Sequence, residues 1–445
     1  MSYTTRIAAF SFTTLILTII LIVLGPRSIP LSLVAQTPVG EEVPAGVAIR
    51  ITFSRPVDPQ SAEESFRLTP PVSGDFFWEG QTLIFQPSQP LRAATRYRVS
   101  FNATLRDRAG RPVGDELAWE FRTRHPQLLL LRATDSGSSE LWLVDPDDRE
   151  SRQLLLTAEG VHEVVAAPDG TRAIYTELRG LSRSALMLID LATGTTRPLV
   201  DDERGSAATP AWAPTSDLIV FERRTLLSEG LGLPHVWLAQ PDGTLLGPLE
   251  SGEGSESSYA PTWSPDGNLI ASIATKDQTL RVYSFFTDKQ RELPAVAAER
   301  PTWLPDSSGL IYSSAEVGSS GPALRLRLVG LGEAPATRGL TDGTAAEFGP
   351  AVAPHGRAVA FTRRSRSGMQ SRIWLVSPDG GMPRPLSSAG PHEDTQPTWS
   401  PDGRLVAFTR SSGAATHERW AVLVDPATGE EELLIDGVVQ LTWIP

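Results

Sequence analysis

A short motif recurs seven times between Val164 and the C-terminus of this 445-residue chain. Each copy has a small or aromatic residue two positions before a proline, and in all but the last copy a polar tight turn follows. The prolines advance from 168 to 445 in six steps, an average spacing of about 46 residues. A fixed period in this range is typical of β-propeller blades. The copies span 166–170, 212–216, 263–267, 303–307, 352–356, 399–403 and 443–445.

Each repeat contains four strand-like segments. The first carries the motif, the second is apolar, the third often contains an aromatic residue, and the fourth is short and more polar, as an outer edge strand should be. Residues 128–132 look like a second strand with no first strand before them, and 441–445 look like a first strand with nothing after them. We therefore expect these two segments to pair, complete a seventh blade and close the ring. Six blades is the alternative, if one weak repeat is not a blade.

The sequence Trp-Ser-Pro-Asp-Gly at 263–267 and 399–403 resembles the TolB-type, WD40-like repeat, also called PD40. The resemblance covers residues 125–445 and implies a β-propeller. It is specific for architecture and says little about the ligand. Two repeats depart from it, because the first lacks the tryptophan and the fifth has Val352 in its place.

Residues 37–124 read as short strands whose apolar residues alternate, for example Val47, Ile49, Ile51 and Phe53. Many short strands separated by polar turns predict a β-sandwich. The segments 53–58, 107–110 and 121–123 resemble the bacterial Ig-like domain of S-layer and other surface proteins (SbsA-like), which implies a spacer or adhesion module without catalytic residues. Asp58 and Asp107 are predicted to fix turns through side chain to backbone bonds. A cation site is the alternative.

The first 36 residues form a membrane anchor or signal segment followed by a linker. Residues 7–24 carry no charge and just reach the length that spans a bilayer as a helix. We expect an uncleaved transmembrane helix with the bulk of the chain extracytoplasmic; the alternative is a cleaved signal peptide and a secreted protein.

Composition excludes several classes of function. The net charge of −12 argues against nucleic-acid binding. Without any cysteine, thiolate catalysis and cysteine-ligated zinc are impossible. Nearly all basic residues are arginine, with lysine only at 276 and 289, which we attribute to coding bias. The six histidines show no metal-ligand spacing, and neither a nucleophile elbow nor a phosphate-binding loop occurs. We expect no cofactor and no metal.

The recurring aspartates and tryptophans have structural interpretations. Asp169, Asp266 and Asp402 occupy the same place in different blades, too far apart to act together, and are predicted to shape turns. The tryptophans lie on strands and are predicted to pack between blades rather than to form a sugar-stacking platform. They are Trp212, Trp263, Trp303, Trp399 and Trp443.

A four-stranded meander puts its first-to-second and third-to-fourth turns at one end, where the sequence here is short; we call that end the tight-turn face. The longer connections meet at the other end, the loop face, where binding usually resides. Its charges are expected to form a solvated rim, unless aromatic residues cluster there. His392, Glu393 and Asp394 form a local group of possible metal ligands. The candidate partner-binding residues are Arg223, Arg224, Glu253, Glu256, Tyr259, Phe348, Arg364, Arg366, His392, Glu393 and Asp394.

Taken together, these features predict a monomeric, non-enzymatic, membrane-anchored binding or scaffold protein. Its loop face would bind a protein or a cell-envelope polymer. The alternative is a glycan or lactone hydrolase, which needs two carboxylates about 5–10 Å apart in the channel. The acidic side chains considered for that pair are Glu203, Glu256, Glu347 and Glu393.

Overall fold

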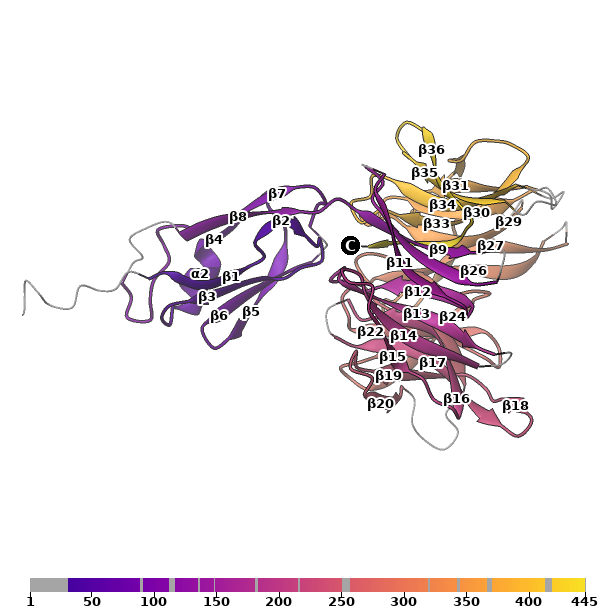
Figure 1. Cartoon of the computed structure of the whole chain (residues 1–445), viewed down its shortest axis with the longest axis horizontal. Coiled ribbons are helices and arrows are strands. Elements are labelled where there is room, and N and C mark those ends of the chain that lie inside the picture. Colours follow the sequence, from indigo (N-terminus) through magenta and orange to yellow (C-terminus); the bar gives the residue numbers. More distant parts are fainter. Residues whose placement is uncertain are drawn as a thin grey trace, which may run out of the picture. The chain divides into compact units, whose positions relative to one another are not determined.

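The computed structural model describes residues 31–88, 91–111, 117–134, 137–147, 149–180, 183–214, 217–249, 257–318, 321–341, 345–365, 370–412 and 418–444. This part of the chain is built from β-strands and one short helix, so the all-β prediction is confirmed (Figure 1). None of its helices is long and apolar enough to cross a membrane. The predicted anchor at 7–24 lies outside the described residues, so it stays a prediction.

Two four-stranded sheets form the N-terminal sandwich. The apolar alternation that the sequence shows is reproduced in its core, where Phe53 of one sheet meets Phe101 of the other with ring centroids 5.4 Å apart. The predicted start at residue 37 falls at the end of the first strand. One sheet has the order β1 (Leu33–Thr37), β3 (Ile49–Phe53), β6 (Thr82–Pro87), β5 (Gly74–Glu79), and the other β2 (Gly40–Val43), β8 (Leu117–Thr123), β7 (Arg96–Phe101), β4 (Phe66–Thr69).

Both turn aspartates of the sandwich act as predicted. Asp58 is the N-cap of α2 (Pro59–Ser65), a helix that the sequence analysis did not expect; its carboxylate accepts from the Ser61 amide at 2.9 Å. Asp107 accepts from the amides of Ala109 and Arg111 at 2.9 and 3.0 Å. The hydrogen bond from the Arg111 amide lowers the pKa of Asp107 most, and the Arg111 side chain adds to it. Both carboxylates are therefore used by the local fold.

Seven four-stranded antiparallel units follow, which we number blades 1 to 7. Seven, not six, is therefore the number of repeats. A short strand, β18 (Gly230–Leu231), extends blade 3, and a parallel bridge between Ser371 and Glu393 joins blades 6 and 7 into an eight-stranded sheet. Blades 1 to 3 are β37 (Val438–Ile444), β9 (Gln127–Ala133), β10 (Ser139–Val144), β11 (Ser151–Thr157); β12 (Val161–Ala166), β13 (Arg172–Arg179), β14 (Arg183–Asp190), β15 (Thr196–Val200); and β16 (Gly205–Trp212), β17 (Ile219–Leu227), β19 (His235–Ala239), β20 (Leu245–Pro248). Blades 4 to 7 are β21 (Ser258–Trp263), β22 (Leu269–Ala274), β23 (Thr279–Ser284), β24 (Lys289–Val296); β25 (Thr302–Trp303), β26 (Gly309–Gly318), β27 (Gly321–Gly330), β28 (Thr337–Gly339); β29 (Ala346–Val352), β30 (Val359–Arg364), β31 (Ser371–Val376), β32 (Arg384–Pro385); and β33 (His392–Trp399), β34 (Val406–Ser412), β35 (Arg419–Val424), β36 (Glu431–Asp436).

The two ends of the repeat region meet in blade 1, as predicted. Strand β37 pairs antiparallel with β9, and Trp443 lies opposite Leu128. Blade 1 therefore takes its innermost strand from the end of the chain and its other three from the start of the repeats. The ring is closed by backbone hydrogen bonds between β37 and β9. This pairing leaves no exposed sheet edge at the junction.

The motif tryptophans pack between blades, which confirms their structural interpretation. They are only 6–7% exposed. Four of them also donate Nε1–H to a carbonyl of the preceding blade's innermost strand, so that each links two neighbouring sheets. The bonds run from Trp212 to Val165 (3.4 Å), Trp303 to Thr262 (3.4 Å), Trp399 to Ala351 (3.0 Å) and Trp443 to Thr398 (3.3 Å).

Arginines of the fourth strands link the blades at the tight-turn face. In five blades a guanidinium donates to a backbone carbonyl in the third-to-fourth turn of the next blade. In blades 1 and 4 one guanidinium donates to two carbonyls at once. The donors are Arg152 (to Leu191 and Ala192), Arg197 (to Pro241), Arg291 (to Leu331 and Gly332), Arg338 (to Pro378) and Arg384 (to Pro426).

Candidate functional site

The structure places the described candidate residues on strands and not on loops. The strands run further toward the loop face than the sequence indicated, because the second and third strands of several blades continue pairing past the apolar core. In blade 5, β26 and β27 stay paired as far as Gly318 and Gly321. Arg223 and Arg224 belong to β17, Tyr259 to β21, Phe348 to β29, Arg364 to β30, and His392, Glu393 and Asp394 to β33. Glu253, Glu256 and Arg366 lie outside the described residues.

A second proline, two positions before the tryptophan position, escaped the sequence analysis. It is preceded in four blades by a residue with positive φ, at 51–61°, where the innermost strand bulges. Proline offers no N–H to the strand ladder, and a bulge redirects the side chains before it. The recurrence of this second proline in the sequence could have predicted the bulge. The residue pairs are Thr209–Pro210, Ala260–Pro261, Gly349–Pro350 and Gln396–Pro397.

Ion pairs occupy the ends of the innermost and second strands of blades 6 and 7. Glu347 is 0% exposed and accepts from Arg363, whose guanidinium also lies 4.5 Å from the centre of the Trp374 ring. In blade 7 both oxygens of Asp394 accept from Arg410, at 2.7 and 2.9 Å. Each pair faces directly across the two strands. Glu347, considered for the hydrolase, is therefore held by an arginine.

The group His392, Glu393 and Asp394 is not arranged as a metal site. Asp394 is committed to Arg410, and His392 Nε2 lies 3.6 Å from the nearer Asp394 oxygen. Among the described residues no three His, Asp or Glu side chains are grouped so that they could hold a metal ion. Arg410 also binds Glu431 at 2.9 Å. Burial alone would raise the pKa of Glu431, but hydrogen bonds from Arg410 and Ser388 outweigh it and lower the pKa.

Blade 3 repeats the pattern with different partners. Arg223 pairs with Asp202, and its guanidinium lies 4.5 Å from the centre of the Trp237 ring. The Arg204 amide, followed by the Arg223 side chain, lowers the pKa of Asp202. Arg224 donates to buried Glu222 at 2.8 Å. Four blades thus have an arginine at the same register on the second strand, stacked on an aromatic ring: Arg132, Arg223, Arg363 and Arg410.

The two predicted aromatic residues do not meet. Burial raises the pKa of Tyr259, and the nearby Glu222 carboxylate adds to the effect. Phe348 lies in another blade and is covered by Arg364, 5.3 Å from the ring centre. No ring contact joins Tyr259 to Phe348 in the described structure. These two residues therefore do not form the aromatic cluster that we required for a protein-binding patch.

An ion pair connects two blades that are not neighbours. Arg300 precedes the innermost strand of blade 5, Glu163 lies on that of blade 2, and their side chains meet at 2.8 Å. The next carboxylate, Glu299, accepts from the Gly349 amide of blade 6 at 2.7 Å and from the Ser313 hydroxyl. Burial raises the pKa of Glu299 in spite of these two hydrogen bonds. Arg300 and Glu163 thus link two blades across the ring, and the neighbouring Glu299 has a raised pKa.

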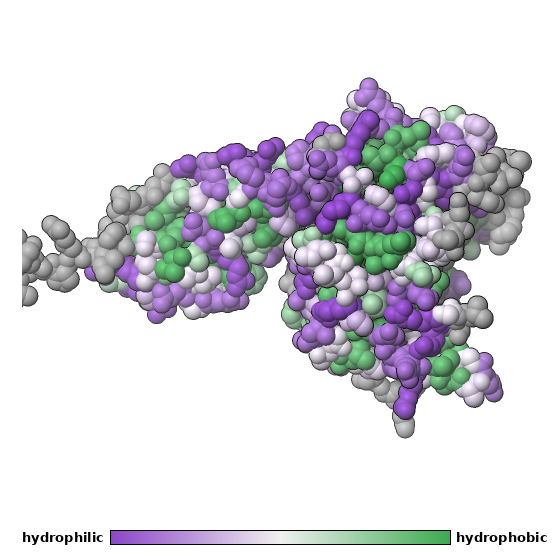
Figure 2. Space-filling model, viewed as in Figure 1, coloured by the Kyte–Doolittle hydropathy of each residue, from purple (hydrophilic) through white to green (hydrophobic). Residues whose placement is uncertain are grey.

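Blade 3 projects a hairpin at the loop face, where the sequence analysis expected an irregular loop. Strand β17 continues to Leu227 and turns back through β18, with Leu226 opposite Leu231. Leu226, Leu227 and Leu233 are 40%, 56% and 66% exposed. β18 stands out beyond the neighbouring strands of the propeller (Figure 1), and a hydrophobic patch covers this region in the space-filling view (Figure 2). Large apolar side chains are thus presented on a paired, hydrogen-bonded element.

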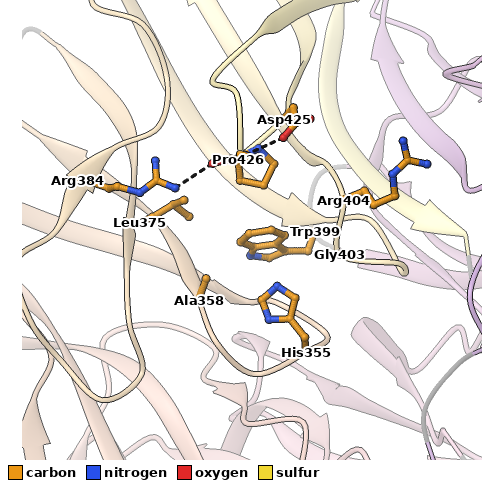
Figure 3. Close-up of a pocket in the computed structure, with 10 residues that line it drawn as sticks. His355, Ala358, Leu375, Arg384, Trp399, Gly403, Arg404, Asp425 and Pro426 are labelled. Carbon is orange, nitrogen blue, oxygen red and sulfur yellow. Dashed lines mark hydrogen bonds between the residues drawn. The ribbon is translucent and has the colours of Figure 1, made fainter. Parts of the chain in front are cut away.

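A pocket of about 420 Å³ opens on the tight-turn face, between blades 6 and 7. Trp399 and Pro426 lie one above the other at its centre, Arg384 and Arg404 stand on either side, and His355 is below (Figure 3). Arg384 donates to the Pro426 carbonyl at 2.9 Å. From the sequence we predicted only turn shaping at this face. The aspartates do shape the turns: Asp402 accepts from Ser400 Oγ and the Arg404 amide at 2.6 and 3.1 Å.

Comparison with solved structures supports the fold of the repeat region. The β-propeller domain of the trilobed protease from Pyrococcus furiosus is similar over 70% of this chain and 97% of its own, with a TM-score of 0.51 and 14% identity. A puromycin hydrolase is similar over 72% of this chain and 54% of its own, with a TM-score of 0.55 and 18% identity. TolB from Acinetobacter baumannii aligns over 87% of this chain and 84% of its own, at a TM-score of 0.46 and 13% identity. The TM-scores of the first two structures show a shared fold, and at identities below 25% the similarity does not extend to activity.

A comparison of the whole chain with curated protein sequences gave no significant match. A family match was found for the N-terminal sandwich. Residues 27–123 match the bacterial Ig-like domain family, as the motifs at 53–58, 107–110 and 121–123 indicated.

Proposed function

We propose that this is a non-enzymatic binding protein whose propeller loop face binds a protein partner. The observation that carries the proposal is the β17–β18 hairpin, with its exposed leucines 226, 227 and 233. Exposed apolar side chains gathered on a rigid element are typical of interaction sites.

The topology favours the loop face as the partner-binding end. Strand β9 begins at the tight-turn end of blade 1, so the chain enters the ring there, and the hairpin lies at the opposite end. The N-terminal segment 7–24 would hold the protein in a membrane, with the Ig-like domain as spacer. Protease accessibility of the full chain in intact cells tests this placement: expected is digestion from outside, with a fragment containing 7–24 retained in the membrane fraction.

Site-directed photocrosslinking tests the binding proposal. A benzoylphenylalanine is placed at Ser228 in the hairpin of the full-length protein, and a matched one at Thr287 in a tight turn of blade 4. We expect a discrete crosslinked protein from position 228 only, which is lost in Leu226→Ser/Leu227→Ser and kept in the control Leu433→Ser, a leucine that is 60% exposed on β36. Crosslinks that survive the hairpin variant, or that arise equally at 287, would contradict the proposal.

One observation favours a hydrolase as the second candidate. Glu299 has a raised pKa, as a general acid needs. Turnover of glycan or lactone substrates that is abolished in Glu299→Gln but kept in the hairpin variant would support this candidate over the first.

A further inference from the structure

The pocket between blades 6 and 7 lies where blade 6 departs from several other blades at two positions. Ala358 stands at the beginning of the apolar second strand, where blades 3, 4 and 7 have Leu218, Leu269 and Leu405. Alanine is smaller than leucine by an isopropyl group, and Ala358 lines the pocket together with Trp399 and Leu375. Its volume of about 420 Å³ lies in the range of about 300–1,000 Å³ that small-ligand sites occupy.

The second departure is His355, which replaces the aspartate of the turn. The aspartates accept a hydrogen bond from the amide two residues on, as Asp402 does from Arg404. His355 performs the same task with Nδ1, which accepts from the Arg357 amide at 3.0 Å. An Nδ1 that accepts leaves the proton of the neutral ring on Nε2. His355 thereby shapes its turn and keeps a hydrogen-bond donor for the pocket.

The ring of His355 is held in place from two sides. Its centroid lies 5.9 Å from that of Trp399 in an edge arrangement. Gly403 packs on it so closely that a Cβ at that position would lie 3.2 Å from His355 Cδ2. The donor is therefore fixed relative to the apolar floor that Trp399 and Pro426 form (Figure 3).

The charged groups of the pocket favour an anion. No carboxylate of the described chain lies within salt-bridge distance of the Arg404 guanidinium, and Arg384 uses Nη2 for the Pro426 carbonyl. The one lining carboxylate, Asp425, is engaged by the amide of Ala427 at 2.7 Å, within its own turn. Two guanidinium groups and the Nε2–H of His355 thus stand around the apolar surfaces of Trp399 and Pro426.

We propose that this pocket binds a small carboxylate carried on a ring, with the carboxylate at one of the flanking guanidinium groups, Arg384 or Arg404, and the ring against Trp399 and Pro426. Arginine is the preferred partner of carboxylates because its planar fork matches their two oxygens. Aromatic and proline rings offer flat apolar surface to the body of the ligand. The inference concerns the tight-turn face and is independent of the function proposed for the loop face.

Calorimetric titration of the full-length protein tests the proposal with phenylacetate as probe and phenylacetamide as its uncharged match. We expect saturable binding of phenylacetate at millimolar concentration and binding of the amide weaker by about tenfold or more, as loss of a charge-assisted hydrogen bond implies. A titration with glucuronate distinguishes a sugar acid from an aromatic acid as the ligand that fits better. No saturable binding of either carboxylate, or equal affinity for the amide, overturns the proposal.

Three variants assign the binding to the pocket. Ala358→Leu and His355→Asp restore residues that other blades carry, so both should fold, and circular dichroism and thermal unfolding verify this. Each should weaken binding by about tenfold or more, as should Arg404→Gln. Arg357→Gln, in the same turn but outside the pocket lining, should bind as the wild type does. Binding unchanged in Ala358→Leu would place the probe elsewhere and refute the site.

Discussion

The two faces of the propeller use charged side chains in different ways. At the tight-turn face, carboxylates and guanidinium groups bond mainly to backbone: Asp402 accepts from the Arg404 amide, and Arg338 donates to the Pro378 carbonyl. At the loop face, charges bond to each other, as in the pairs Glu347–Arg363 and Asp394–Arg410. The carboxylates of these two pairs are fully buried.

This difference predicts where substitutions are costly. A carboxylate that accepts from a backbone amide can be replaced by a carboxamide, because the oxygen that accepts is retained. A buried carboxylate that neutralises an arginine cannot, because the guanidinium is left buried and unpaired. The repeat thus keeps its shape by neutral local bonds at one end, whereas the other end depends on matched charge.

The largest effect is expected in blade 1, where no turn joins the first and second strands at the tight-turn face. Deletion of 441–445 removes Leu441, Trp443 and Ile444, which are 7%, 6% and 1% exposed. We expect a loss of about 5 kcal/mol or more in the free energy of unfolding, since each large buried side chain contributes about 1.5–3 kcal/mol. Thermal and denaturant unfolding measure it. Unfolding that is unchanged by the deletion would show that β37 does not hold the ring closed.

The same isosteric change on the two faces tests the comparison directly. Glu347→Gln should cost about 3–5 kcal/mol, because it removes the charge of a fully buried carboxylate that is paired with Arg363. Asp402→Asn should cost less than about 1 kcal/mol, because its side-chain oxygen still accepts from Ser400 and Arg404. Denaturant unfolding of both variants measures the two losses in the free energy of unfolding. Equal losses would remove the distinction between the faces.

A smaller effect is expected for the arginine links. Arg338→Met deletes the bond to the Pro378 carbonyl and should cost about 0.5–1.5 kcal/mol, the net value of one hydrogen bond. Arg357→Met is the control, since no carboxylate in the described part of the chain lies within salt-bridge distance of Arg357. Urea unfolding should separate the two. A loss above about 3 kcal/mol for Arg338→Met would mean that this face also depends on buried charge.

The smallest effect is a pH dependence at Glu299. Burial raises its pKa, so the folded protein holds the proton more tightly than the unfolded chain does. The stabilisation from this group is therefore present below the usual value of about 4.3 and is lost as the pH rises through the folded pKa.

Glu299→Gln does not titrate at this position. Its free energy of unfolding relative to the wild type should therefore increase as the pH is raised from about 4 to about 7. Urea unfolding at a series of pH values measures the difference. A difference that stays constant with pH, or decreases, contradicts the raised pKa.

Much of the fold was predictable because it is periodic. The motif spacing predicted the number of blades. The aspartates and tryptophans within the motif were correctly predicted to shape turns and to pack between blades, since each role depends on a few neighbouring residues. The short helix after Asp58 was missed although Asp58 and Pro59 are a known helix start. The candidate site was predicted less well: Arg223 and Asp394 were placed on loops, because strand pairing beyond the apolar core leaves no hydrophobic pattern.

The sequence by itself determined that the chain is an Ig-like sandwich followed by a seven-bladed ring that its own last strand closes. The spacing of the motif and the apolar alternation along the chain encode these features. Both can be recognised in the sequence without knowing which residues are close in space. Only the tertiary structure decided that Arg300 meets Glu163, that Arg410 binds Asp394 and Glu431, and that Ala358 lines a pocket. Each of these depends on distances between residues that the closed ring or the strand pairing brings together, and spacing along the chain does not record such distances.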